Sequence, residues 1–304
     1  MGVTHDRIER RLMQLKKAER TGLYSRIALD GPPGSGKTWS ALAIATGLKG
    51  NKKILVLDTE HGTAKKYAED FEFYEGDPLP DFSPDNYTSF IETAGRNSEV
   101  GVLIIDSLSH AWSGKGGALE QVDKIAKRSN SGNTFAAWRD VTPMHNRLVE
   151  AMLASPFHLI VTMRTKTEYV LEKNETTGKL QPRKLGMAPI QRDGIEYEMD
   201  LVGDMNLEHD LVVSKTRYKF LDGMVINRPT KQLGEDIAKW LSGAAAVPVM
   251  ATNTQIRELV ELGRKHDKTP DEIAALSRKM FGRSPREVTT EQMELLKYQL
   301  TMAA

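Results

Sequence analysis

One eight-residue run near the start of the chain constrains the fold more than any other feature. The run fits the pattern G-x-x-x-x-G-K-[ST] and consists of Gly31, Pro32, Pro33, Gly34, Ser35, Gly36, Lys37 and Thr38. Apolar residues 27–29 precede it, and the helix formers of residues 41–45 follow it. In such a strand–loop–helix, backbone N–H groups surround phosphate oxygens and the helix N-terminus adds its dipole. The run therefore predicts a phosphate-binding loop.

The residue types in and after this loop indicate a nucleoside triphosphate with Mg²⁺. Lys37 is expected to contact the β- and γ-phosphates, and the Thr38 hydroxyl is expected to ligate Mg²⁺. The apolar run 102–105 ends in Asp106, and an aspartate at the carboxyl end of a buried strand can hold the Mg²⁺ shell. ATP and Mg²⁺ are thus the predicted cofactors, with Thr38 and Asp106 as metal ligands. No histidine cluster has metal-ligand spacing, so no other metal is expected.

Short apolar strands alternate with helical stretches from residue 25 onward. The predicted strands are 26–30, 53–58, 101–106, 158–163, 201–205 and 211–214. The predicted helices are 37–48, 84–94, 117–127 and 135–154. Strand and helix in repeated order favour an α/β fold with a mainly parallel sheet between helices.

The chain is long enough for more than one domain, because single cores stop growing at roughly 250–300 residues. Residues 243–252 are small and uncharged and include a proline, as in a linker. Residues 21–242 are the predicted ATPase core, and residues 253–304 a small domain of three helices. Residues 1–20 are basic and predict either a surface helix docked by three apolar side chains or an interaction arm.

Composition excludes several classes of protein. Lysine and arginine number 42 and aspartate and glutamate 41, which argues against a uniformly basic protein. There is no cysteine, so a disulfide scaffold, a thiolate metal site and a cysteine nucleophile are excluded. No apolar run approaches the roughly 20 residues that span a bilayer, and no leader pattern opens the chain. We expect a cytoplasmic protein without membrane contact.

A carboxylate just past the second predicted strand indicates hydrolysis. Glu60 follows the strand 53–58 at the edge of the sheet where ligands bind. A carboxylate at that edge can orient and deprotonate the water that attacks the γ-phosphate, whereas a kinase, whose acceptor is an alcohol, needs no such group. A solvated acid at a strand end is the structural alternative.

Several runs in the same order resemble the RecA-type ATPase core. The match is closer to phage-encoded RecA-core AAA-family ATPases of the Sak single-strand-annealing type, and it covers about residues 17–242. The runs that carry it are residues 17–20, 29–38, 58–63, 105–112, 137–143, 163–169, 191–200 and 213–217. The resemblance implies a RecA-like P-loop core and an ATPase acting in DNA recombination or replication.

The same resemblance implies residue roles and an oligomer. Glu60 corresponds to the catalytic base, and Lys215 and Arg217 correspond to a cationic pair that enters the nucleotide site of the neighbouring subunit. Such a pair requires a homo-oligomer, either a ring or a filament. The structural alternative is an exposed pair on an edge strand. The glutamine that senses the γ-phosphate in RecA has no counterpart, and Arg164 is the candidate in its place.

The long connection 164–192 is the predicted contact with single-stranded DNA. It carries seven basic and three acidic residues in a chain whose net charge is +1, and residues 169–179 predict a hairpin. Basic residues beside an aromatic suit backbone contacts and base stacking. The candidate contacts are Lys166, Tyr169, Lys173, Lys179, Arg183 and Lys184. A hairpin used only for subunit packing is the alternative.

The sequence thus predicts a Mg²⁺-dependent ATPase, stimulated by DNA, in phage or mobile-element recombination or replication. Its expected partners are other copies of itself, single-stranded DNA, and single-strand-binding or other replication and recombination proteins. Its location is then the cytoplasm of the bacterial host. The alternative function is an ATP-dependent switch or loader that binds a partner protein, hydrolyses slowly and has no direct DNA role.

Overall fold

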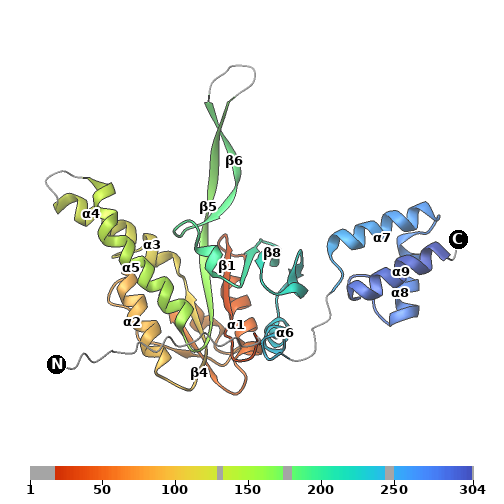
Figure 1. Ribbon diagram of the computed structural model, residues 1–304, viewed down its shortest axis with the longest axis horizontal. Helices are drawn as coiled ribbons and strands as arrows, with labels where there is room; N and C mark the ends of the chain where they lie inside the picture. The colour runs from red at the N-terminus through yellow and green to blue at the C-terminus, as the bar shows by residue number, and fades with distance from the viewer. Residues whose placement is uncertain (1–17, 129–132, 174–179, 244–249, 303–304) are drawn as a thin grey trace, which may run out of the picture.

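A computed structural model describes residues 18–128, 133–173, 180–243 and 250–302, and its strands form one sheet (Figure 1). Within these ranges the strand order is β3-β2-β4-β5-β1-β7-β8-β9, with β6 paired to β5 outside this path. The strands are β1 (Arg26–Gly31), β2 (Lys53–Asp58), β3 (Tyr74–Glu75), β4 (Val100–Asp106), β5 (His158–Lys173), β6 (Leu180–Pro189), β7 (Leu201–Met205), β8 (Asp210–Thr216) and β9 (Val225–Asn227). The pairs from β3 to β7 are parallel, and β8 and β9 continue the sheet antiparallel.

Helices cover both faces of the sheet (Figure 1). In the described residues the helices are α1 (Lys37–Leu48), α2 (Pro84–Gly95), α3 (Ser109–Ser113), α4 (Ala118–Arg128), α5 (Thr134–Ala154), α6 (Lys231–Leu241), α7 (Asn253–Lys265), α8 (Pro270–Phe281) and α9 (Thr290–Met302). The last three do not cover the sheet and belong to a separate hydrophobic cluster. Every residue of β1 is buried, with Ile27 and Leu29 in the cluster of α1 and α6 and Ala28 in the cluster of α2 and α5. Burial on both faces explains the continuous apolar strands.

The α/β fold class predicted from the sequence is confirmed, since the sheet is mostly parallel and lies between helices. All six predicted strands and all four predicted core helices are present. Pattern reading missed the two-residue β3, the three-residue β9, the one-turn α3 and the whole of α6. The first three are too short for a period to show.

Strand β5 changes partners in the middle of its length. It pairs in parallel with β1 as far as Arg164, and from Thr165 onward it pairs antiparallel with β6. The predicted hairpin is confirmed in its backbone and is longer than expected. Its tip, residues 174–179, lies outside the described residues. In Figure 1 the hairpin projects away from the helical layers.

The last three helices have a hydrophobic cluster of their own, built around Leu259, Ile273 and Leu296. Capping boxes at Thr252 and Thr269 start α7 and α8. This cluster supports the proposed division at 243–252, which remains a prediction. Residues 1–17, at the predicted basic arm, and 244–249, in the predicted linker, lie outside the described residues. None of the helices in the described ranges has the length and apolar character needed to cross a bilayer.

Helices α1 and α6 cross at a pair of glycines. A Cβ atom added to Gly47 would lie 2.0 Å from the Lys231 carbonyl oxygen, and one added to Gly234 would lie 2.0 Å from the Ile44 carbonyl oxygen. The two backbones can therefore approach this closely only without side chains at these positions. Because α1 starts at the phosphate-binding loop, this contact also supports the loop.

The substitution Gly234→Ala is expected to lower the free energy of unfolding by about 1–3 kcal/mol, because the added methyl group forces two helix backbones apart. Urea unfolding followed by circular dichroism measures the change. Lys239→Ala, on an exposed position of the same helix, is the control and is expected to stay within about 0.5 kcal/mol of wild type. Equal stability of Gly234→Ala and wild type would contradict the close crossing.

Candidate functional site

The phosphate-binding loop joins β1 to α1, and its backbone requires glycine at two positions. Gly36 has a φ of 87°, and a Cβ there would lie 3.1 Å from His209 Nδ1. Gly31 has a φ of 152°, and a Cβ there would lie 2.5 Å from the Met205 carbonyl oxygen. Left-handed and crowded positions of this kind exclude other residues. The turn between β7 and β8 therefore packs directly against the loop.

Lys37 lies at the mouth of this loop. Its Nζ donates hydrogen bonds to the carbonyl oxygens of Gly31 at 2.8 Å and Pro32 at 2.9 Å. Burial lowers the pKa of the Lys37 ammonium, while the carboxylates of Asp106 and Glu60 act in the opposite direction. The loop thus holds a cation against its own backbone, and a fixed cation at such a loop suits the binding of phosphate oxygens.

Asp106 ends β4 and is bonded by hydroxyl groups from two other elements. Thr38 Oγ1 donates to Asp106 Oδ2 at 2.7 Å, and Thr162 Oγ1 on β5 donates to Oδ1 at 2.5 Å. Burial raises the pKa of the Asp106 carboxyl, whose residue is 2% exposed. A hydroxyl and a carboxylate oxygen side by side are hard ligands that fit Mg²⁺. No group of three or more histidine, cysteine or acidic side chains that could hold a metal ion occurs in the described residues.

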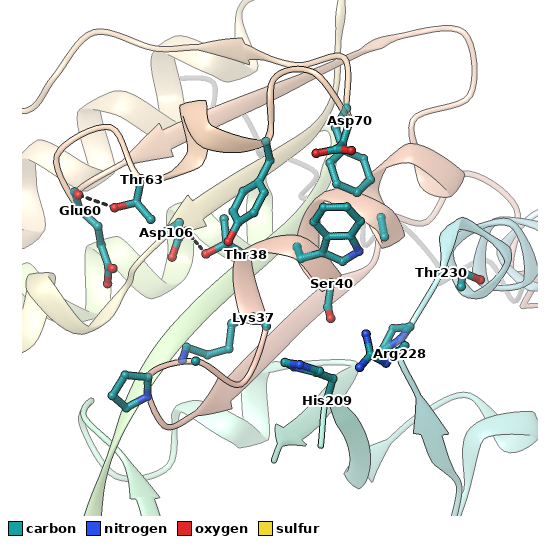
Figure 2. A pocket seen from close by; sticks show the side chains of 18 of the residues that line it. Lys37, Thr38, Ser40, Glu60, Thr63, Asp70, Asp106, His209, Arg228 and Thr230 are labelled. Atoms are coloured by element: carbon teal, nitrogen blue, oxygen red, sulfur yellow. Dashed lines mark hydrogen bonds between the residues drawn. The ribbon is translucent and has the colours of Figure 1, made fainter. Parts of the chain in front are cut away.

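The turn after β2 sets the position of Glu60 through the side chain of Asp58. Asp58 accepts hydrogen bonds from the backbone N–H of Glu60 at 2.6 Å and of Ala64 at 2.9 Å. Thr63 Oγ1 donates to the Glu60 carbonyl oxygen at 2.8 Å (Figure 2). The role of Asp58 was not predicted, although an aspartate that bonds the backbone two residues on is a known turn signal.

Arg164 reaches Glu60 across the cleft. Arg164 Nε lies 2.9 Å from Glu60 Oε1, and the backbone N–H of Arg164 donates to Ser109 Oγ at 2.9 Å. The Arg164 side chain is 49% exposed and that of Glu60 is 27% exposed, so the pair contributes little stability. The ion pair matters because of where it lies: Arg164 is the last residue of β5 that pairs with β1, directly before the hairpin begins.

The predicted nucleotide residues converge on one cleft of about 1260 Å³. Lys37, Thr38, Glu60, Asp106 and Arg164 all line it, together with loop residues Pro33, Gly34 and Gly36. Figure 2 shows Glu60 and Asp106 toward one end of the cleft, and His209 and Arg228 toward the other. Segments that are far apart in the sequence therefore meet around one cavity.

Lys215 and Arg217 do not line this cleft. They lie against the one-turn 3₁₀ helix η2 (Ile195–Glu198) and the residues after it. Lys215 Nζ donates to the carbonyl oxygens of Glu196 and Tyr197 at 2.8 and 2.9 Å, and Arg217 Nη1 lies 2.8 Å from Asp200 Oδ1. Within one chain these two cations are remote from the nucleotide residues.

The candidate DNA-contacting residues fall on the hairpin. Lys166 is exposed on β5. In the backbone register Tyr169 of β5 pairs with Lys184 of β6, and Arg183 pairs with Val170. Lys173 is the last residue of β5, and Lys179 lies outside the described residues. The hairpin backbone thus brings an aromatic and a basic position opposite each other.

Sequence reasoning missed several residues that line the cleft, among them Trp39, His209, Arg228 and Thr230. Trp39 is 42% exposed and lines the cleft. Its position directly after the loop motif could have indicated that it lies at the cleft. Outside the cleft, His110 and Trp112 pack against Phe82 and Trp138 respectively.

A pair of carboxyl groups lies beside the loop. Asp30 is opposite Asp204 in the parallel register of β1 and β7, and it is 6% exposed. Burial and the neighbouring Asp204 raise the pKa of Asp30 to about 7. The folded protein therefore holds a proton at this pair that the unfolded chain releases at lower pH. The free energy of unfolding therefore falls as pH rises through this range, because the native state binds more protons than the unfolded chain.

The stability of wild type is expected to fall between about pH 4 and pH 7 through this pair. Asp30→Asn removes the titrating group and is expected to flatten this part of the profile. Thermal unfolding midpoints across that window measure the difference, with Asp222→Asn, at an exposed position, as the control. Parallel profiles for wild type and Asp30→Asn would contradict the raised pKa.

The chain has no match among curated proteins. Among solved structures, the crystal structure of the RadB recombinase matches with 17% identity and a TM-score of 0.36, over 64% of this chain and 82% of that chain. A family model described as "AAA domain" matches residues 24–227, which is more than half of the chain and contains the cleft residues except those of 228–231. The chain belongs to this AAA-domain family of P-loop ATPases.

Proposed function

We propose that this protein binds ATP with Mg²⁺ and hydrolyses it in a DNA-stimulated reaction of phage or mobile-element recombination or replication. The observation that carries the ATPase part is the meeting of Lys37, Thr38, Asp106 and Glu60 in one cleft. Three of these residues, Lys37, Thr38 and Asp106, suit phosphate and Mg²⁺, and the carboxylate of Glu60 suits the activation of water. The DNA part is supported by the resemblance and by the basic hairpin that leaves this cleft.

In the proposed mechanism the loop N–H groups and Lys37 hold the β- and γ-phosphates. Thr38 and Asp106 hold Mg²⁺, which, when bound, neutralises the charge that develops on the phosphate oxygens. Glu60 orients a water molecule toward the γ-phosphate and accepts its proton. The Asp58 turn keeps the Glu60 carboxylate at the cleft.

Arg164 is the proposed contact to the γ-phosphate. It lines the cleft and already bonds the carboxylate of Glu60. A guanidinium at this place can stabilise the negative charge of the transferring group. Because the same strand continues into the hairpin, a ligand on the hairpin can act on the position of Arg164.

The complete site is proposed to form between two copies in a ring or filament. Lys215 and Arg217 lie away from the cleft of their own chain, as a pair that acts on a neighbour must. A cation supplied in trans at the developing charge acts as an arginine finger. Single-strand-binding or other replication and recombination proteins are further proposed partners.

An ATP-dependent switch or loader with slow hydrolysis is the second candidate. The ion pair between Arg164 and Glu60 favours it, because a carboxylate held by a guanidinium is not free to orient a water molecule. In that function a partner protein, rather than DNA, binds the ATP-bound state. Stimulation by DNA separates the two candidates.

ATP turnover by wild type is expected to rise when single-stranded DNA is added. Glu60→Gln is expected to lower turnover by about 10²–10⁴-fold with little change in ATP affinity, because the proton acceptor is lost and the binding groups remain. Phosphate release and equilibrium binding measure the two quantities. Glu69→Gln, an exposed acid outside the cleft, is the control and should behave as wild type. Turnover that DNA leaves unchanged would favour the switch.

Mixing two inactive variants tests the shared site. Glu60→Gln and Arg217→Ala are each expected to lose turnover, since an arginine finger contributes about 10³–10⁵-fold. A mixture is expected to regain part of the activity, because some interfaces combine the intact Glu60 of one copy with the intact Arg217 of the next. Arg147→Ala, an exposed arginine paired with Asp85, is the matched control. Failure of the mixture to regain activity would contradict a site completed in trans.

A further inference from the structure

The cleft extends well beyond the phosphate-binding loop along one face of α1. Ser40, Ala43 and Thr46 line it at helical spacing, and all three side chains are small. Six residues of helix rise by about 9 Å, which is room for a flat ring and a sugar beyond the phosphates. The walls of this part of the cleft belong neither to the loop motif nor to the strand that ends in Asp106.

Trp39 offers an aromatic surface in this part of the cleft. Its ring meets Tyr67 and Phe71 edge-on, with centroid distances of 5.6 and 4.8 Å. Both partners pack against the core cluster of α1, so they hold the indole in place. Nevertheless 42% of Trp39 is exposed. A large aromatic ring that is fixed and open to a cleft is suited to stacking on a flat ligand.

Arg228 and His209 line the same part of the cleft from the other end of the sheet. Neither is glycine, yet both have a left-handed backbone, with φ of 47° and 66°. The N–H of Arg228 donates to the His209 carbonyl oxygen at 2.9 Å, and His209 Nδ1 lies 3.1 Å from the Ser35 carbonyl oxygen. Unfavourable backbone of this kind costs about 1–3 kcal/mol per residue and clusters at ligand clamps.

The guanidinium of Arg228 is free to meet a ligand. It is exposed, and within the described part of the chain no carboxylate forms an ion pair with it. In Figure 2 Ser40 lies between Asp70 on one side and His209 and Arg228 on the other. A planar guanidinium can stack on a base or bond a sugar or phosphate oxygen.

We propose that this part of the cleft, lined by Trp39, Ser40, Ala43, His209 and Arg228, is a nucleoside subsite. The base, preferentially a purine because two rings cover more of the indole, stacks on Trp39, and the Arg228 guanidinium holds the nucleoside from the β9–α6 segment. The proposal rests on the proposed function and deepens it by assigning the binding of the nucleoside. The phosphates remain with the loop and Lys37.

The proposed subsite predicts different contacts for three ligands. Inorganic tripolyphosphate occupies only the loop, ADP occupies the loop and the nucleoside subsite, and ATP adds the γ-phosphate. A variant at the nucleoside subsite must therefore lose ADP and ATP affinity equally and keep tripolyphosphate. Lys37→Ala, in contrast, weakens all three ligands.

The test measures the dissociation constants of Mg²⁺ complexes of ATP, ADP and tripolyphosphate by titration calorimetry on the full chain. Trp39→Ala and Arg228→Ala are each expected to weaken ATP and ADP by about tenfold, which corresponds to the loss of one stacked contact. Tripolyphosphate binding should change by less than about twofold. Arg147→Ala is the matched control, and circular dichroism verifies the folding of each variant.

A second readout uses the conservative variant Trp39→Phe, which keeps a stacking ring and should retain most of the ATP affinity. ATP is expected to quench tryptophan fluorescence in wild type and not in Trp39→Phe, since the other three tryptophans lie outside the cleft. Equal quenching in both proteins would overturn the assignment of Trp39.

Unchanged ATP and ADP affinity in Trp39→Ala and Arg228→Ala, or equal affinity of wild type for tripolyphosphate and ATP, would overturn the subsite. If wild type binds neither ATP nor tripolyphosphate, both the proposed function and the proposed nucleoside subsite are wrong.

Discussion

The buried carboxylate of Asp106 is the contact on which the organisation of the cleft depends. A buried charge is costly unless it is hydrogen-bonded, and here hydroxyl groups of Thr38 and Thr162 supply the bonds. These two threonines belong to α1 and to β5, so one side chain of β4 ties the phosphate-binding loop to the neighbouring strand. The same donors place the carboxylate beside Thr38, where Mg²⁺ is expected.

The order of the strands explains why the hairpin begins at this cleft. β5 lies between β1 and β4, and its carboxyl end therefore emerges beside the loop. From there the strand continues as half of the antiparallel hairpin instead of ending in a turn. Arg164, at the point of change, bonds Glu60. A ligand held by the hairpin and a nucleotide in the cleft thus share one continuous strand.

The cleft also shows how a phosphate-binding loop is extended into a nucleotide site. The loop supplies N–H groups and a lysine that suit any polyphosphate. The face of α1, with Trp39, and the segment that carries Arg228 add an aromatic surface and a cation that a bare polyphosphate does not need. The left-handed backbone at His209 and Arg228 keeps this wall close to the loop.

Local patterns in the sequence determined the loop, the buried strands, the core helices and the acids Asp106 and Glu60. These features follow from residue spacing over a few positions, and such spacing reports directly on local backbone and burial. The amphipathic α6 was missed because Gly234 reads as a helix breaker until its packing on α1 is seen.

Only the tertiary structure decided which distant residues meet. Arg164 and Glu60 are 104 positions apart, and Trp39 opens into a cleft whose other wall comes from residues 228–231. The distance of Lys215 and Arg217 from that cleft likewise depends on the order of strands in the sheet. Local periodicity carries no information about that order, because each strand presents the same alternating faces whichever neighbours it pairs with.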